Sequence, residues 1–178
     1  DALVDYATSM ERLHDVVDGF VVNVSSPNTP NLRDLQHEEA LKDLLAGLAQ
    51  RLKELNAGVS LPRPMLVKFA PDLATDTLLS LVDVAREAGA DGVVLTNTTV
   101  ERGPPSHPKH ARFLAEQGGL SGAPLKDRST AMIRAVHEHT GGTWPIIGVG
   151  GISTAADANE KLQAGATLLQ AYSAFVFE

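Results

Sequence analysis

Residues 65–96 read MLVKFAPDLATDTLLSLVDVAREAGADGVVLT, and this segment contains the clearest repeating unit of the chain. Two short apolar runs, Met65–Phe69 and Gly92–Thr96, are apolar at successive positions, which is typical of strands buried on both faces. Between them, Thr75–Ala88 has helical spacing, begins with a residue suited to an N-cap, and ends just before Gly89. Strand, helix and strand in this order predict two parallel strands joined by a covering helix.

The same alternation continues along the rest of the chain. Three further apolar runs have the character of buried strands: Phe20–Val24, Pro145–Val149 and Thr167–Tyr172. Helical patterns accompany them at Ala2–Val17, Leu35–Leu55, Leu125–Thr140 and Thr154–Ala164. Repeated units of this kind, with long connections at 25–40 and 100–123, predict an α/β fold of the (β/α)8 TIM barrel type, with its site at the carboxyl ends of the strands. A doubly wound open sheet is the structural alternative.

The barrel prediction covers only part of a complete barrel. A (β/α)8 barrel has eight strands and about 250 residues, whereas this chain has 178 residues and five detectable strands. We therefore expect residues 1–178 to form the C-terminal part of a single barrel domain, a partial barrel of about five βα units. About three strands would precede it and one helix would follow it, so this part alone would expose two strand edges.

Composition excludes several classes of function. The formal net charge is −7, which argues against a nucleic-acid-binding protein with its usual basic patch. The chain has no cysteine, so it has no disulfide, no thiolate metal site and no catalytic thiol. No apolar run approaches the roughly 20 residues that a membrane-spanning helix needs.

Polar residues or glycines lie at, or just beyond, the carboxyl end of every predicted strand. In chain order they are Asn23 with Ser25, Ser26 and Asn28; Lys68; Thr96 to Thr99; Gly148, Gly150 and Gly151; and Tyr172 with Ser173. Because the carboxyl ends of parallel strands converge, we expect these residues to share one pocket. Lys68 follows three apolar residues, so its stem should be buried and its ammonium should need an anionic partner.

Two glycine-rich segments indicate a phosphate site in that pocket. Gly118–Gly122 and Gly150–Gly151 each offer bare backbone amides that can close around an anion. In barrels, the loops after the last two strands often hold a phosphate. Taken singly, the Gly150–Gly151 pair is better explained as a tight turn, and Gly118–Gly122 is compatible with a flexible linker.

The histidines and acidic residues indicate no metal centre and no paired-carboxylate hydrolase. His137 and His139 are two positions apart on a predicted helix and therefore point in different directions. Acidic residues such as Glu38 and Glu39 fall on predicted helix surfaces.

Six segments of the chain resemble the dihydroorotate dehydrogenase family, class 2. In the family's order they are NVSSPNTPNLRDLQ (23–36), VKFAPDL (67–73), GVVLTNTT (92–99), GGLSGAPL (118–125), PIIGVGGI (145–152) and GATLLQAYSAF (165–175). The resemblance implies a (β/α)8 barrel that holds FMN and oxidises dihydroorotate to orotate in de novo pyrimidine biosynthesis. The class rests on Ser26, because class 1 members have a cysteine there as catalytic base.

The resemblance also implies roles for individual residues. Ser26 is the expected catalytic base, and Pro27 restricts the backbone before it so that the hydroxyl is held in a fixed direction. The expected substrate contacts are Asn23, Asn28, Asn97 and Thr98. The expected FMN contacts are Asn23, Lys68, Thr96, Gly122, Gly151, Tyr172 and Ser173. Asparagine amides complement the N–H and C=O groups of the substrate ring, and Lys68 would lie near the N1–O2 edge of the flavin, where reduction develops negative charge.

The expected partners are dihydroorotate and orotate, with a quinone as electron acceptor and no nucleic acid. The resemblance implies a cytoplasmic location, peripheral on the inner face of the cell membrane, with the membrane contact made by an N-terminal region outside this sequence. Two alternatives remain at this point. One is another FMN- or phosphate-binding TIM-barrel enzyme, and the other is a partial barrel without catalytic activity.

Overall fold

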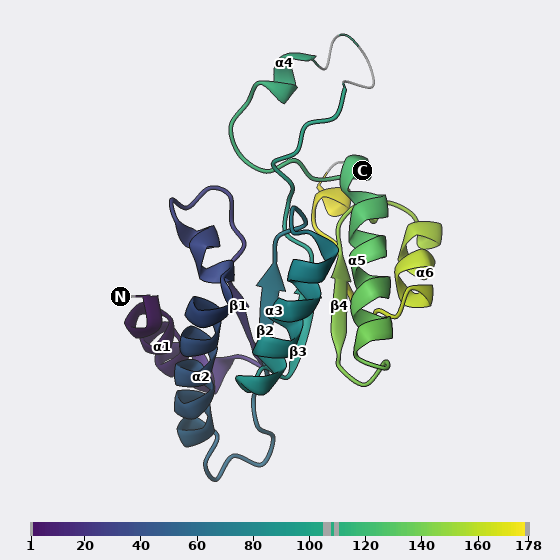
Figure 1. The fold of residues 1–178 in the computed structure, drawn as a ribbon. Helices are drawn as coiled ribbons and strands as arrows, with labels where there is room; N and C mark the ends of the chain where they lie inside the picture. Colours follow the sequence, from purple (N-terminus) through teal and green to yellow (C-terminus); the bar gives the residue numbers. More distant parts are fainter. Residues whose placement is uncertain (1, 105–107, 109–110, 177–178) are drawn as a thin grey trace.

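The chain forms one sheet of five parallel strands (Figure 1) in a computed structural model that describes residues 2–104, 108 and 111–176. The strands are β1 (Phe20–Asn23), β2 (Met65–Phe69), β3 (Gly92–Leu95), β4 (Ile146–Val149) and β5 (Leu168–Gln170). Each strand pairs in parallel with the next along the chain, in the order β1-β2-β3-β4-β5. This order has no reversal, as in consecutive units of a barrel, and it argues against the doubly wound alternative. The predicted partial (β/α)8 barrel is confirmed.

Helices connect the strands and pack in sequence order. The α-helices are α1 (Ala2–Leu13), α2 (Glu38–Leu55), α3 (Thr75–Glu87), α4 (Ala111–Leu114), α5 (Lys126–His139) and α6 (Ala155–Gln163). The short 3-10 helices are η1 (His14–Val16), η2 (Leu32–Gln36), η4 (Ala123–Leu125) and η5 (Ser173–Phe175). Neighbouring helices contact one another in the order α1, α2, α3, α5 and α6. None of the helices in the described ranges is long and apolar enough to cross a membrane.

The predicted helix ends were less accurate than the predicted strands. The pattern over Leu35–Leu55 divides into η2 and α2, and the pattern over Ala2–Val17 divides into α1 and η1. The N-cap of α3 is Ala74, with extended backbone and no side-chain cap, so the prediction of Thr75 as N-cap was wrong. Thr154 does cap α6, because its hydroxyl accepts from Asp157 N at 3.2 Å while Asp157 Oδ2 accepts from Thr154 N at 2.9 Å.

The strands direct alternate side chains to opposite faces of the sheet. In β2, Met65, Val67 and Phe69 are fully buried beneath the helices. Leu66 and Lys68 lie on the other face and are half-buried. This alternation delivers the Lys68 side chain to the face that the helices do not cover.

The connection between β3 and α5 leaves the sheet and returns to it. It carries α4 on an excursion beyond the carboxyl ends of the strands (Figure 1). Thr99 and Leu120 close the base of the excursion as an antiparallel bridge, with Leu120 N 2.7 Å from Thr99 O and Thr99 N 3.1 Å from Leu120 O. The chain therefore re-enters beside the strand ends at Ser121 and Gly122.

Candidate active site

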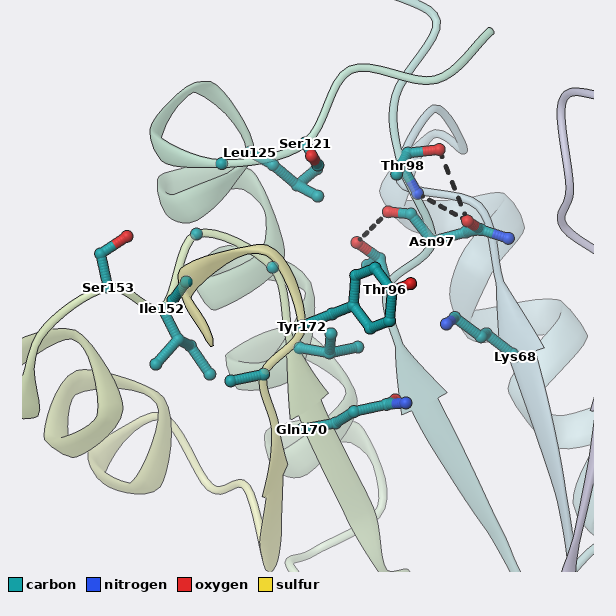
Figure 2. A pocket seen from close by; sticks show the side chains of 16 residues that line it. Lys68, Thr96, Asn97, Thr98, Ser121, Leu125, Ile152, Ser153, Gln170 and Tyr172 are labelled. Carbon is teal, nitrogen blue, oxygen red and sulfur yellow. Dashed lines mark hydrogen bonds between the residues drawn. The ribbon is translucent and has the colours of Figure 1, made fainter. Parts of the chain in front are cut away.

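A cavity of about 360 Å³ lies at the carboxyl ends of β2 to β5 (Figure 2). Its lining comes from four strand ends and from the segment that precedes α5. The lining residues are Lys68, Thr96, Asn97, Thr98, Ser121, Gly122, Leu125, Val149, Gly150, Gly151, Ile152, Ser153, Gln170, Ala171, Tyr172 and Ala174. Seven of the predicted site residues are therefore brought together: Lys68, Thr96, Asn97, Thr98, Gly122, Gly151 and Tyr172.

Lys68 supplies a cation to the cavity from the middle of the sheet. Burial lowers the pKa of Lys68 below its ordinary value of 10.5. Among the described residues, its ammonium has neither a carboxylate nor a hydrogen-bond partner. The expectation of a partly buried stem is confirmed, whereas no anionic partner for Lys68 is found in the described part of the chain. A half-buried ammonium of this kind is suited to an anionic or electron-rich ligand.

The segment after β3 supplies amide and hydroxyl groups next to Lys68. Thr96 is buried, and its hydroxyl donates to Asn97 O at 2.9 Å. Asn97 Oδ1 accepts from Thr98 N at 2.8 Å (Figure 2), which fixes the orientation of the amide. Asn97 Nδ2 is thereby directed toward the end of β1.

The side-chain amide of Asn97 forms hydrogen bonds with Asn23 and Ser25. Asn97 Nδ2 donates to Ser25 Oγ at 2.9 Å and to Asn23 Oδ1 at 3.3 Å. Asn23 is also the register partner of Lys68 in the neighbouring strand, so the two side chains share one face of the sheet. Asn23 thus belongs to the same polar group as Lys68 and Asn97, although it is not among the residues that line the cavity.

Ser26 and Asn28 follow Ser25 in the loop after β1. Ser26 is half-buried, and its hydroxyl accepts from Asn28 N at 3.2 Å. Asn28 is exposed, and neither residue lines the cavity. Their roles as catalytic base and substrate contact remain predictions.

Two backbone turns at the opposite end of the cavity form a cradle without side chains. Gly151 has φ +69°, and a Cβ built there would lie 2.5–2.8 Å from the Cβ, Cα and N atoms of Lys126. Gly122, directly before η4, lines the same end. Of the glycines in the predicted segment Gly118–Gly122, Gly122 alone lines the cavity. Gly118 packs against Asn28, and Gly119 packs against Thr98.

Ion pairs hold the two helices behind this cradle together. Lys126 Nζ, at the start of α5, lies 2.8 Å from Asp157 Oδ1 and 2.9 Å from Glu160 Oε2, both in α6. Hydrogen bonding to these carboxylates raises the pKa of Lys126, and the Lys126 ammonium holds the pKa of Asp157 well below its usual range. The Lys126 and Asp157 side chains are 30% and 14% exposed, and these partly buried pairs orient α5 relative to α6.

The C-terminal strand adds residues that sequence reasoning only partly identified. Tyr172 is largely exposed and lines the cavity together with Gln170 and Lys68 (Figure 2). Ser173 begins η5 directly after Tyr172. Gln170 was missed, although its position at the carboxyl end of β5 was the signal that identified the other residues. Ile152 and Ser153 follow the cradle glycines and also line the cavity. They were missed as well, although they too lie just beyond the carboxyl end of a strand.

This combination defines the class of protein. Consecutive βα units of a barrel place an ammonium, an amide cluster and a side-chain-free cradle around one cavity at the strand carboxyl ends. The cradle suits a phosphate, and the polar end suits a planar ring with hydrogen-bonding edges. The fold and site are those of a (β/α)8-barrel protein with a polar ligand cavity at the carboxyl ends of its strands.

Comparison with known proteins gives the family. The family model described as Dihydroorotate dehydrogenase matches residues 1–178. The chain belongs to the dihydroorotate dehydrogenase family, as its sequence motifs predicted.

Individual relatives agree with this assignment. The chain is 50% identical over 178 residues to a protein of Christiangramia forsetii named dihydroorotate dehydrogenase (quinone), with 99% of this chain and 50% of that protein covered. It is 47% identical over 190 residues to a protein of the same name from Synechococcus, with 100% and 48% covered. The chain spans about half the length of the curated relatives it matches.

The similarity extends to solved structures. A crystal structure of DHODH from Eimeria tenella, determined in complex with ferulenol, superposes with a TM-score of 0.89 at 32% sequence identity. The superposition covers 99% of this chain and 50% of that chain. The ligand-free form from the same organism gives a TM-score of 0.87 at 33% identity.

Proposed function

We propose that the protein containing this chain oxidises dihydroorotate to orotate with FMN as cofactor and passes the electrons to a quinone. The observation that carries the proposal is the single cavity in which Lys68, the Asn97–Thr98 segment and the glycine cradle meet, in a chain of this family. The reaction belongs to de novo pyrimidine biosynthesis.

The residues present fit FMN in two respects. The turn at Gly151 has a positive φ and leaves no room for a side chain against Lys126, so its backbone is bare, and backbone amides there suit a phosphate. Lys68 offers a half-buried ammonium without a partner among the described residues, at the end where the flavin ring would lie. Gly122, Tyr172 and Ser173 would hold the phosphate or the chain leading to it, and Thr96 would contact the edge of the ring.

The chemistry divides between cofactor and protein. Dihydroorotate loses a proton from one ring carbon and a hydride from its neighbour, which leaves the double bond of orotate. When bound, FMN supplies the acceptor for that hydride and the route by which electrons reach the quinone.

The chain's own residues would bind the substrate ring and stabilise the negative charge that develops during the reaction. Asn97 and Thr98 would bind the amide edges of the substrate, helped by Asn23 and Asn28. Lys68 would hold a positive charge where negative charge develops, which is worth most in a site with little water. Ser26 Oγ would accept the proton while its own hydroxyl proton passes to a water or a neighbouring hydroxyl, and Pro27 restricts the backbone that carries Ser26.

The quinone is supported by the names of relatives, and the location is supported only by the family resemblance, since neither has a site in this chain. Two relatives carry the name dihydroorotate dehydrogenase (quinone). We therefore propose a quinone acceptor and a cytoplasmic protein held peripherally on the inner face of the membrane.

The test uses the natural protein under anaerobic conditions. Dihydroorotate should bleach the bound yellow flavin, and a quinone should restore its absorbance faster than fumarate or NAD does. Flavin that stays oxidised with dihydroorotate would exclude the substrate assignment. Faster reoxidation by fumarate or NAD would exclude the quinone assignment alone.

A further inference from the structure

Arg33 connects three loops that follow three different strands. Its Nε donates to Ser25 O at 3.2 Å, in the loop after β1. Its Nη1 donates to Asp72 Oδ2 at 2.9 Å, in the loop after β2, and its Nη2 donates to Thr98 O at 3.3 Å, after β3. One planar guanidinium therefore uses all three of its nitrogens to join segments up to 65 residues away in sequence.

Asp72 completes the connection. Its carboxylate accepts from Arg33, from the hydroxyl of Thr99, and from Val100 N at 3.2 Å. The side chains of Arg33 and Asp72 are 25% and 14% exposed. At this burial an ion pair is screened less than a surface pair, and removing one member leaves the other without compensation.

The base of Arg33 is itself anchored. Arg33 lies in η2, and Gln36 at the end of η2 is buried, with its Oε1 accepting from Ala70 N at 2.9 Å. This hydrogen bond fixes η2, and with it the backbone of Arg33, next to the end of β2. The guanidinium then contacts all three loops from a fixed position.

The three joined loops carry the residues of the proposed chemistry. Ser25 adjoins Ser26, and Thr98 adjoins Asn97, whereas neither Arg33 nor Asp72 lines the cavity. We propose that Arg33 and Asp72 are positioning residues that hold the Ser26 loop and the Asn97–Thr98 segment at a fixed separation. This inference rests on the proposed function for its kinetic consequence, but the connection itself can be measured without it.

The experiment compares variants of the natural protein. Arg33→Ala removes the three-way connection, and Arg33→Lys keeps the charge but offers a single ammonium that cannot span three acceptors. Asp72→Asn removes the negative charge that pairs with the Arg33 guanidinium. Arg51→Ala is the matched control, because Arg51 pairs with Glu11 and Glu54 on an exposed surface.

Hydrogen exchange tests the connection directly. In Arg33→Lys and Asp72→Asn, amides in segments 24–31 and 97–101 should exchange faster together, while amides in β2 and α5 should keep their rates. Faster exchange in only one of the two segments, or across all elements alike, would overturn the proposal. The control Arg51→Ala should match the wild type in both segments.

Steady-state turnover tests whether the connection made by Arg33 and Asp72 affects catalysis. Each variant should keep its flavin absorbance and its KM for dihydroorotate within about threefold, while kcat falls by about tenfold to a hundredfold, the loss expected when reacting groups shift by about an ångström. The Arg33→Ala/Asp72→Asn double variant should fall no further than the worse single variant, because both act through one connection. Unchanged kcat in Arg33→Ala, or additive losses in the double variant, would overturn the positioning role. If the wild-type flavin is not reduced by dihydroorotate, the proposed function fails, and the exchange measurement still decides whether the connection exists.

Discussion

Gly119 lies directly against Thr98, so that a Cβ built on Gly119 would be 1.7 Å from Thr98 Oγ1 and 2.5 Å from Thr98 Cβ. The returning end of the β3–α5 excursion therefore packs on a residue that lines the cavity. Thr98 can keep its position only while residue 119 has no side chain.

Gly119→Ala should consequently displace Thr98. We expect orotate to bind at least about tenfold more weakly, because a site that loses one positioned polar contact loses roughly 1–3 kcal/mol. Titration of the flavin absorbance with orotate gives the affinity. Gly103→Ala, in the same excursion with no atom within 4 Å of its built Cβ, should bind orotate as the wild type does. Equal affinities in the two variants would contradict the packing argument.

Gly151→Ala should release flavin. Its Cβ would collide with the first residue of α5 at 2.5–2.8 Å, and α5 would have to move away from the cradle. We expect the dissociation constant for FMN to rise by about tenfold or more, as the cost of overpacking is typically 1–3 kcal/mol. Gly141→Ala is the control, since Gly141 has a similar positive φ of +60° but open space around its Cβ. If both variants retain flavin equally, the close approach of Gly151 to Lys126 does not shape the site.

Lys68→Met should slow flavin reduction. It removes the half-buried ammonium while keeping a side chain of similar length, so negative charge that develops in the cavity loses its cation. We expect the rate constant for anaerobic bleaching by dihydroorotate to fall by about a hundredfold, measured by stopped flow. Lys53→Met, on the exposed side of α2, should leave the rate constant unchanged. A Lys68→Met protein that bleaches at the wild-type rate would exclude an electrostatic role.

The strands could be predicted from sequence because their signal is local. GVVL at residues 92–95 is buried at all four positions, and an uninterrupted apolar run between a glycine and polar residues identifies such a strand by itself. Helix ends were less predictable, because His37 is extended and interrupts an otherwise helical pattern between η2 and α2. No sequence feature distinguished that residue from its neighbours.

The site was predictable in part for a similar reason. Lys68 lies near the carboxyl end of β2 and Asn97 follows β3, and topology alone brings strand ends together. The Arg33–Asp72 pair spans 39 residues between two loops, and no spacing rule connects polar residues in separate loops. Both residues stood inside recognisable motifs, NLRDL and APDL, but their partners became visible only in three dimensions.

Ser26→Ala should separate chemistry from binding. With the hydroxyl absent, turnover of dihydroorotate should fall by about a hundredfold to ten-thousandfold, the range typical of general-base removal, while flavin stays bound. Steady-state kinetics alongside the flavin spectrum gives both quantities. Ser9→Ala, whose hydroxyl only donates to Asp5 O on the exposed side of α1, serves as the control. Undiminished turnover in Ser26→Ala would refute the assignment of the base.

Lys161 makes stability depend on pH. Its side chain is fully buried, with Nζ 3.0 Å from Lys126 O and 2.8 Å from Thr130 Oγ1. Burial lowers the pKa of Lys161 from 10.5 to about 8. Between these two values the unfolded state binds more protons than the folded state, so the contribution of Lys161 to stability increases as pH rises.

Replacement by methionine should remove that increase. The free energy of unfolding of the wild type relative to Lys161→Met should grow between about pH 7 and pH 10, by no more than about 3 kcal/mol. Urea unfolding at a series of pH values measures the difference, and Lys42→Met, exposed on α2, gives the reference. Parallel curves for wild type and Lys161→Met would contradict the burial of a titrating ammonium.

A crystal structure of the natural protein with flavin and orotate bound tests directly whether cofactor and substrate share the cavity at the strand ends. We expect the flavin phosphate against the backbone of Gly122 and Gly151, the Lys68 ammonium within hydrogen-bond distance of the N1–O2 edge of the ring, and orotate between Asn97 and the Ser26 loop. A flavin bound elsewhere, with Lys68 and the cradle empty of ligand, would contradict it.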